Sequence, residues 1–443
     1  MKKIEIRDFR CFRQLSVDLT SGINLFIGDN ASGKTSFLLA CKYAVNSFFS
    51  GYSDLYTLWT YPQKDDFMHI VLGEKRMKTQ PINICFSFSS NDFEMGCDFK
   101  LDKDHPLALK CKNEKSRKPL ISGLRNLRDY GRYLAANAFD LQSDTYGSQN
   151  LALPLFASYS THGIHKKPSV NSKYFKDISQ TPSFGYYLCA STDGLLDHWV
   201  RRLLILEEAD KNPIERQIVI HALKDMFGSE GCDVINDFEV RINYKDVVCV
   251  FNDGREIPTG ILSDGYRRLI SIVVDIAFRS ALLNSMKYGA DAARFTKGTV
   301  IIDEIDLHLH PSLQAVVLKA LHKTFPSIQF IVSTHAPMVM SGVESNEENC
   351  VIHMDYDNST DSYTADRVNT YGMDLSTLAE TVLNIPSRNP EVKHDLDLLA
   401  DLVDEEEYEK AKDFLGQLKA RFGDTLPELS GFDTQISIEE ALR

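Results

Sequence analysis

Three stretches of the chain consist almost entirely of apolar residues and are followed by polar ones. They are Ile23–Ile27, the run 298–302 before Asp303, and the run 329–333 before His335. Short apolar runs of this kind are typical of strands buried on both faces of a parallel sheet. Polar and apolar residues instead alternate over 3–13 and 15–19, which predicts two antiparallel edge strands at the start of the fold.

Helical periodicity follows the first apolar run, at 36–44, and recurs over 269–277. Between about residues 50 and 260 the pattern mixes strand-like segments with helix-like ones at 197–206 and 214–227. We find no long heptad repeat in this region, so we expect a compact lobe and not a coiled-coil arm. Strands that alternate with helices predict an α/β fold.

A phosphate-binding pattern joins the first buried strand to its helix. Residues 28–35 fit G-x-x-x-x-G-K-[ST]. Glycines let backbone amides close on phosphate oxygens, and a helix N-terminus adds positive potential. Lys34 is expected to reach the terminal phosphates and Thr35 to hold Mg²⁺. The sequence therefore predicts an ATP site formed by Gly28, Asp29, Asn30, Ala31, Ser32, Gly33, Lys34, Thr35 and Ser36.

The other two buried strands are followed by residue types that ATP hydrolysis needs. Asp303 suits a Mg²⁺ ligand beside Thr35, and Glu304 suits a general base that positions water. His335 follows the third strand, and the carboxyl ends of parallel strands gather around one ligand. Taken singly, an acidic pair after a strand is usually part of a solvated loop, and a histidine at the end of a strand is more often structural. Together with the phosphate loop they predict catalytic roles for Glu304 and His335.

A fourth motif carries a specific resemblance. Residues 262–268 read Leu-Ser-Asp-Gly-Tyr-Arg-Arg and resemble the signature motif of ABC-type ATPases, in the form found in the RecF, SMC and OLD-like branch. Residues 303–311 are similar to the Walker B and D-loop segment of that branch, and 333–337 to its switch-histidine motif. The resemblance implies an ABC-type P-loop ATPase head, in which Ser263, Asp264 and Gly265 face the nucleotide of a second subunit.

His308 and His310 have the His-x-His spacing of a metal-binding pair. No cysteine or carboxylate cluster with zinc-type spacing surrounds them in the sequence, which favours the D-loop interpretation.

The last sixty residues present a second alternative, because Asp395-Leu-Asp397 has the Asp-x-Asp spacing of a Toprim-type nuclease. This spacing lies inside the acidic helix-like run 394–404, which favours a solvated helix face. The following segment carries an apolar stripe on a charged helix, formed by Tyr408, Ala411, Leu415, Leu418 and Phe422. We expect a helical hairpin here, suited to docking a partner or another subunit.

The compact insert, the helical tail and the run Arg388-Asn-Pro-Glu-Val-Lys393 resemble PtuA, the ATPase family of Septu-type antiphage systems, versions of which also accompany retrons. This resemblance implies a homodimer or higher homo-oligomer that controls a separate His-Asn-His (HNH) nuclease resembling PtuB. Two alternatives stay open, a RecF-like DNA maintenance ATPase without a nuclease partner and an OLD-type standalone nuclease.

The motifs divide the chain into four parts. These are the N-terminal part of the head at 1–50, an insert with helical lobe and returning strands at 51–254, the C-terminal part of the head at 255–385, and the tail at 386–443.

Composition bears on location and partners. No run approaches membrane-spanning length and the nine cysteines contain no C-x-x-C, so we expect a cytoplasmic protein with no membrane partner. A net charge of −13 argues against a surface generally coated with DNA. The candidate DNA-binding patch is local, at Lys110–Lys118 with Arg125, Arg128 and Arg132.

Overall fold

The computed structural model describes residues 1–72, 76–88, 107–111, 124–137, 151–160, 170–177, 181–191, 195–209, 213–383, 386, 388–423 and 426–441. The chain divides into two compact units, Met1–Met373 and Asp374–Arg443, and each is described by itself.

The first unit is built on a six-stranded sheet in the order β15-β14-β3-β13-β12-β8. Its strands are β3 (Ile23–Ile27), β8 (Leu155–Tyr159), β12 (Gly298–Ile302), β13 (Ile328–Ser333), β14 (Cys350–Asp357) and β15 (Ser362–Val368). Only β15 at one edge runs antiparallel. Every residue of β3 and β13 is buried, as their apolar runs predict. The expected α/β class is therefore confirmed, and β8, from the region assigned to the insert, completes the sheet.

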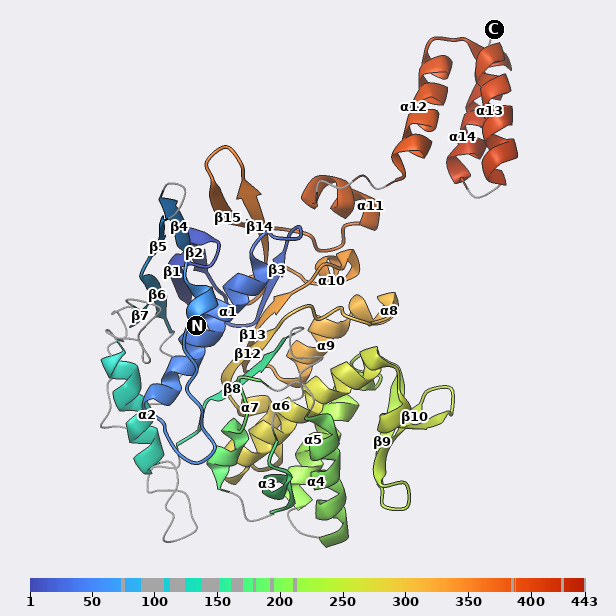
Figure 1. The fold of residues 1–443 in the computed structure, drawn as a ribbon. Helices are drawn as coiled ribbons and strands as arrows, with labels where there is room; N and C mark the ends of the chain where they lie inside the picture. The colour runs from blue at the N-terminus through green and yellow to red at the C-terminus, as the bar shows by residue number, and fades with distance from the viewer. Residues whose placement is uncertain are drawn as a thin grey trace. The chain divides into compact units, whose positions relative to one another are not determined.

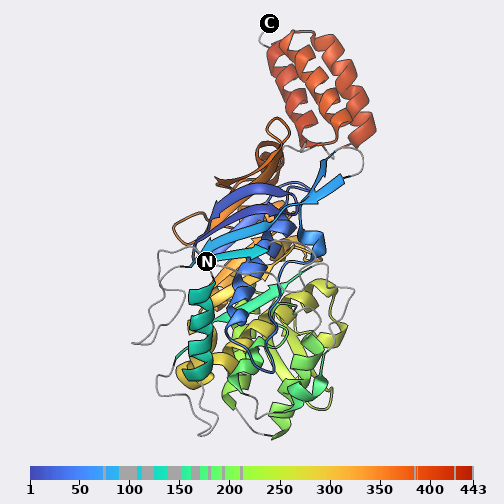
Figure 2. The ribbon, with the colours of Figure 1, turned by 60° about the vertical axis from the view of Figure 1, so that its left-hand side comes forward.

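A four-stranded antiparallel sheet packs beside it, in the order β2-β1-β6-β7. Its strands are β1 (Lys3–Phe9), β2 (Phe12–Asp18), β6 (Ile82–Ser87) and β7 (Leu107–Cys111). The two N-terminal strands pair with each other, but β1 is not an edge strand because β6 pairs with its other side, with Lys3 opposite Ser87. Helix α1 (Lys34–Asn46) contacts strands of both sheets (Figures 1 and 2).

Helices form the remaining layer of this unit (Figure 1). At its centre α6 (Asp264–Tyr288) packs against α4 (Leu196–Ala209), α5 (Pro213–Phe227) and β8. The stretch Asp264–Phe295 contains an 18-residue window with a mean hydropathy of 1.5, which is long and apolar enough by composition to cross a membrane, contrary to the expectation that no run would be. Since 78% of that window is buried inside the protein, core packing accounts for its apolar composition.

A buried polar network joins this helical layer to the sheet. The carboxylate of Asp275 on α6 accepts hydrogen bonds of 2.7 Å from the Tyr159 hydroxyl of β8 and 2.7 Å from the Trp199 indole of α4. It also pairs with Arg279, whose guanidinium donates to backbone carbonyls of Gly185 and Tyr187. The buried Asp275 carboxylate thus has an ion-pair partner and further hydrogen-bond donors, which offset the free-energy cost of removing its charge from water.

Smaller elements complete the first unit. They are β4 (His69–Leu72), β5 (Arg76–Thr79), α2 (Arg125–Asn137), α3 (Ser172–Lys176), β9 (Ile235–Arg241), β10 (Asp246–Phe251), β11 (Glu256–Pro258), α7 (Ala292–Phe295), α8 (Pro311–Gln314), α9 (Val317–Thr324) and α10 (Pro337–Ser341). Strands β9, β10 and β11 form an antiparallel sheet that leads directly into the segment before α6.

The second unit contains three long helices where two were expected. After the short α11 (Leu375–Thr377) come α12 (Pro390–Asp404), α13 (Tyr408–Phe422) and α14 (Pro427–Ala441). Four members of the expected stripe, all but Phe422, are buried in a core that also takes Leu429 and Ile436 from α14. The sequence of α14 has Gly431 and several hydroxyl residues, which are poor helix formers, so its helicity depends on this packing.

Candidate nucleotide-binding and hydrolysis site

The phosphate loop between β3 and α1 contains two glycines in backbone conformations that residues with a side chain rarely adopt. Gly28 and Gly33 have φ of 135° and 94°, in the region that favours glycine. A Cβ on Gly28 would lie 2.1 Å from the carbonyl oxygen of Met354, and one on Gly33 would lie 2.7 Å from the Phe12 ring. Asp29, Asn30 and Ala31 form the exposed tip of the loop, while Ser32 is buried and Ser36 half-buried. The sequence therefore folds here as the pattern predicts.

Lys34 is the first residue of α1 and points back into the loop. Its side chain is buried, and Nζ lies 2.8 Å from the carbonyl oxygens of Gly28 and Asp29 and 3.3 Å from Ser32 Oγ. Burial lowers the pKa of Lys34 to about 8, although nearby carboxylates, Asp303 first among them, oppose the shift. The hydrogen bonds of this ammonium to the loop go to uncharged oxygens. A bound phosphate, which is an anion, would therefore form stronger, charge-assisted hydrogen bonds with it.

Asp303, directly after β12, faces the start of α1. Its carboxylate is buried, and Oδ1 accepts hydrogen bonds from Thr35 Oγ1 at 3.4 Å and from Ser333 Oγ at 2.6 Å. A carboxylate beside a hydroxyl is the hard-oxygen donor set that Mg²⁺ prefers, so Thr35 and Asp303 fit the expected metal. Ser333 belongs to the segment that resembles the switch-histidine motif, and its hydrogen bond orients this carboxylate, a role that the sequence does not predict.

Glu304 follows in an uncommon backbone conformation, with φ of 51°. Its amide donates to Ser333 Oγ at 2.9 Å, and its carbonyl oxygen accepts from the guanidinium of Arg268. The side chain is half-buried. The residue predicted to be the base thus sits at a turn fixed from two sides, and neither Ser333 nor Arg268 was predicted to be part of the site.

His335 follows β13, the strand between the phosphate-loop strand and the Asp303 strand. Its ring is exposed, and its amide lies 3.4 Å from Asp306 Oδ1. The same carboxylate oxygen accepts a 2.5 Å hydrogen bond from Thr334 Oγ1. Asp306 therefore ties the histidine segment to the loop after Glu304, a contact between strands that a single sequence does not reveal.

The signature residues begin α6. Ser263 is the residue before its first turn, and Ser263 and Asp264 are both exposed. Gly265 is buried, and a Cβ there would lie 2.1 Å from the carbonyl oxygen of His308. The glycine thus packs on the loop after Glu304 of the same chain, while the two residues before it are open to an outside ligand.

The two histidines of the possible metal pair have other environments. His310 caps α8, with Nδ1 2.8 Å from Ser312 Oγ, and His308 is exposed. Within the described ranges no group of three or more His, Cys, Asp or Glu side chains could hold a metal ion. In the tail Asp395 pairs with Arg421 at 3.0 Å, as a residue of a solvated helix face does.

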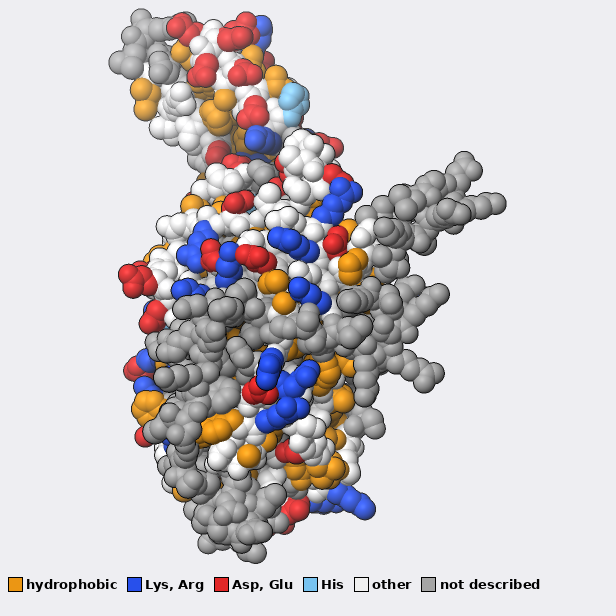
Figure 3. Space-filling view, turned by 90° about the vertical axis from the view of Figure 1, so that its left-hand side faces the viewer, with side chains coloured by type: hydrophobic (Ala, Val, Ile, Leu, Met, Phe, Trp, Pro, Cys, Tyr) orange, Lys and Arg blue, Asp and Glu red, His pale blue; other side chains and the backbone are white. Residues whose placement is uncertain are grey.

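The candidate DNA-binding patch is described only in part, because 112–118 lie outside the described residues. Lys110 is exposed on β7, and the Arg125 and Arg132 side chains of α2 are 92% and 66% exposed. Both arginines approach Asp129, so the acidic residue offsets part of their charge. Figure 3 shows Lys and Arg side chains gathered on this face beside acidic ones.

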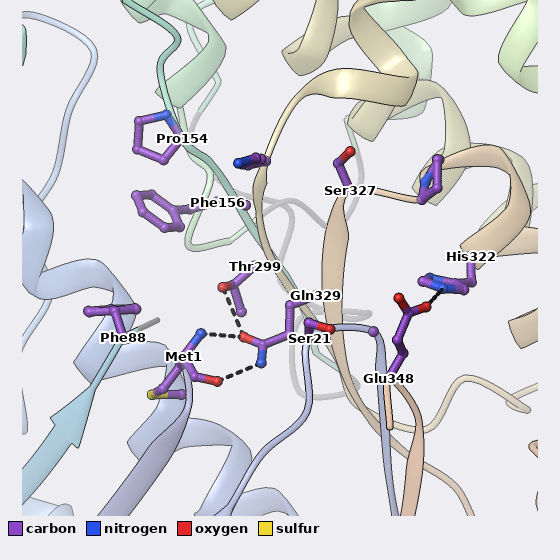
Figure 4. A pocket seen from close by; sticks show the side chains of 14 residues that line it. Met1, Ser21, Phe88, Pro154, Phe156, Thr299, His322, Ser327, Gln329 and Glu348 are labelled. Atoms are coloured by element: carbon purple, nitrogen blue, oxygen red, sulfur yellow. Dashed lines mark hydrogen bonds and ion pairs between the residues drawn. The ribbon is translucent and has the colours of Figure 1, made fainter. Parts of the chain in front are cut away.

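A separate cavity of about 180 Å³ lies at the opposite edge of the six-stranded sheet, where β3, β8, β12 and β13 begin (Figure 4). Gln329 lines this cavity, and its side-chain oxygen accepts a hydrogen bond of 2.7 Å from the amino group of Met1. Its side-chain nitrogen donates to the carbonyl oxygens of Met1 and Thr20. These polar groups satisfy one another, so they join the N-terminal segment to the sheet.

Comparison with known proteins agrees with this geometry. The family model described as "AAA domain, putative AbiEii toxin, Type IV TA system" matches residues 23–341. A retron Vc95 probable ATPase of Vibrio cholerae serotype O1 biovar El Tor is 26% identical, over 80% of this chain and 74% of that protein. Two shorter matches each cover 19% of this chain. One is to a retron Ec83 probable ATPase of Escherichia coli, which is 45% identical over 15% of its own length. The other is to a Septu protein PtuA of Bacillus mycoides (strain KBAB4), which is 38% identical over 11% of its own length.

The family match spans every motif from the β3 strand to the residues after His335, which is most of the first unit. The chain therefore belongs to the AAA-domain family that this model describes, and it is an ATPase.

Proposed function

We propose that this chain hydrolyses ATP with Mg²⁺ at sites shared between two heads, and that its nucleotide state controls an associated nuclease in an antiphage defence complex. The observation that carries the catalytic part is the gathering of Lys34, Thr35, Asp303 and Glu304 at one edge of the parallel sheet. Ligands of open α/β sheets bind at this edge.

Each residue has a distinct task in the proposed reaction. Lys34 gives up its hydrogen bonds to the loop carbonyls, donates instead to the terminal phosphates and so orients them. Glu304 takes the proton of the attacking water, and His335 contacts the terminal phosphate from the neighbouring strand. Mg²⁺, held by Thr35 and Asp303, would neutralise charge on the phosphate oxygens.

Exposure of Ser263 and Asp264 supports the shared site. These residues begin a helix whose N-terminus favours anions, and they are open to a second molecule. Two identical heads that meet by a two-fold axis would each offer a phosphate loop and a signature helix, so two sites would form together.

The names of the relatives support the defence role. Retron ATPases and Septu PtuA are among the proteins that this chain resembles. We propose an HNH nuclease resembling PtuB as its partner, on the resemblance of the motifs and the tail to PtuA. DNA is a further candidate partner, at the patch around Lys110, Arg125 and Arg132. The RecF-like and OLD-type alternatives would require that the chain works without a nuclease subunit, or cuts DNA by itself.

The experiment compares the wild type with Glu304→Gln and Lys34→Ala. Glu304→Gln keeps the side-chain shape but loses the base, so turnover should fall by roughly 10²–10⁴-fold while ATP binding persists. Light scattering with Mg-ATP should then find dimers for Glu304→Gln and monomers for Lys34→Ala. Unchanged turnover in Glu304→Gln would contradict the assigned base.

The partner is tested by purifying the full chain expressed with its neighbouring genes. A small nuclease that co-purifies with the chain supports the defence complex. Metal-dependent DNA cleavage by the purified chain alone would favour the OLD-type alternative instead.

A further inference from the structure

We propose that Arg268 is a positioning residue, which holds the Glu304 turn in place and links it to the signature segment at the start of α6. The inference rests on the proposed role of Glu304 as the base. It assigns a task to a residue whose guanidinium donates hydrogen bonds to the backbone of Asp303 and Glu304.

Arg268 reaches from α6 to the turn after β12. One terminal nitrogen donates to the carbonyl oxygen of Asp303 at 2.7 Å, and the other donates to the carbonyl oxygen of Glu304. The planar guanidinium thus donates hydrogen bonds to two successive backbone carbonyls. A lysine has a single ammonium without this fork geometry, so it cannot reproduce this pair of hydrogen bonds.

The turn that Arg268 contacts has an unfavourable backbone conformation at Glu304. Glu304 has a φ of 51°, which is unfavourable for a residue with a Cβ and persists only where neighbours impose it. Its amide is held by Ser333 Oγ from β13, and its carbonyl by Arg268 from α6. The Glu304 carbonyl also accepts the backbone amide of Leu307 at 3.2 Å, so removing Arg268 leaves the Ser333 and Leu307 contacts and takes away the one that comes from α6. The direction of the Glu304 side chain is then less firmly fixed.

The same helix turn also touches the loop beyond Glu304. Gly265 lies three residues before Arg268, on the same side of α6, and packs on the backbone of His308 and Leu309. Two contacts on one helix face therefore join the signature segment to the turn of the same chain. If Ser263 engages the nucleotide of a second subunit, any movement of α6 reaches Glu304 through these contacts.

The adjacent Arg267 provides a matched control. It is on the same helix turn, but its guanidinium bonds the carbonyl oxygen of Gly260 at 3.0 Å and pairs with Asp197. Arg267→Met and Arg268→Met each remove one guanidinium from α6. Only the second loses the contacts with Asp303 and Glu304.

The test measures ATP affinity, single-turnover hydrolysis and thermal unfolding of the full chain. We expect Arg268→Met to bind ATP within about 2-fold of wild type and to hydrolyse it roughly 10–100-fold more slowly, since small misplacements of reacting groups have effects of this size. Arg268→Lys should recover part of the rate, and Arg267→Met should stay within about 3-fold of wild type.

A double mutant separates positioning from a general effect on the fold. In the Glu304→Gln background, Arg268→Met should lower hydrolysis no further, because the group that it positions is already gone. An equal additional loss there, or an equal loss in Arg267→Met, would overturn the proposal. If Arg268→Met lost ATP affinity and thermal stability along with rate, its role would be structural and the proposal would also be overturned.

The outcomes distinguish this proposal from the one on which it rests. If Glu304→Gln alone hydrolyses ATP at the wild-type rate, the assignment of the base fails. If Glu304→Gln is slow and Arg268→Met is as fast as wild type, only the positioning role of Arg268 fails.

Discussion

Ser333 Oγ donates a 2.6 Å hydrogen bond to Asp303 Oδ1, so the last residue of β13 fixes the carboxylate that follows β12. The same hydroxyl accepts the amide of Glu304. One small side chain therefore orients both acidic residues of the site. These two hydrogen bonds explain why a buried serine ends the otherwise largely apolar strand β13.

Ser333→Ala should raise the Mg²⁺ concentration required for half-maximal hydrolysis. The substitution leaves the ligands in place but frees the Asp303 carboxylate, and loss of such supporting contacts typically weakens metal binding by about 10–100-fold. Magnesium titrations of ATPase activity measure the effect. Ser327→Ala, at the opposite edge of the sheet, is the control and should leave the titration unchanged. A Mg²⁺ requirement equal to wild type in Ser333→Ala would show that Asp303 is held by other means.

Lys34→Ala should weaken ATP binding by about 1.5–3 kcal/mol, the size of a hydrogen bond to a charged group. The phosphates would lose their buried cation, while the loop backbone, which depends on Gly28 and Gly33, would stay in place. Equilibrium binding of a fluorescent ATP analogue measures the difference. Wild-type affinity in this variant would refute the site.

ATP binding should take up protons at mildly alkaline pH. The pKa of Lys34 is lowered to about 8 by burial, so near pH 8 the nucleotide-free protein carries this lysine about half protonated. A bound phosphate favours the ammonium and raises that pKa, so binding draws in about half a proton at pH 8 and affinity falls as the pH rises above 8. Calorimetry in two buffers of different ionisation enthalpy measures the uptake, and Lys34→Ala should abolish this component.

Leu415→Ala should unfold or loosen the C-terminal unit without affecting ATP binding. Leu415 is 3% exposed in a core shared by all three long helices, and truncation of such a leucine typically costs about 2–5 kcal/mol. Leu398, which is 40% exposed on α12, provides the control substitution. Hydrogen exchange resolved by segment should show faster exchange in 390–441 alone. Lost ATP affinity in Leu415→Ala would indicate that the two units depend on each other.

The parts of the fold that follow from local pattern could be read from the sequence. Apolar runs identified β3, β12 and β13, and the order of motifs indicated one sheet edge for Lys34, Asp303 and Glu304. Pairing over long separations could not be read, which is why β1 was expected to be an edge strand although β6 pairs with its other side. The third tail helix was missed because its apolar residues follow no clear helical period and depend on packing against α12 and α13.

The roles of the residues that support the site could not be predicted from the sequence for the same reason. Ser333, Asp306 and Arg268 each act through one hydrogen bond or two to a segment far away along the chain. Their residue types are common in loops and helices, so no local signal separates them from ordinary polar residues. The motifs that contain Ser333 and Arg268 were visible, but the tasks of these two residues within them were not.

The central claim is that two heads share each ATP site, and mixing two inactive variants tests it most directly. Lys34→Ala lacks the phosphate-loop cation and Ser263→Leu lacks the exposed signature hydroxyl, so each homodimer should have no competent site. A mixed dimer combines the intact loop of one subunit with the intact signature of the other, and forms one. Confirmed mixed dimers should show about half of the wild-type hydrolysis per dimer, because each has one of two sites. No recovery in confirmed mixed dimers of folded subunits would contradict the shared site.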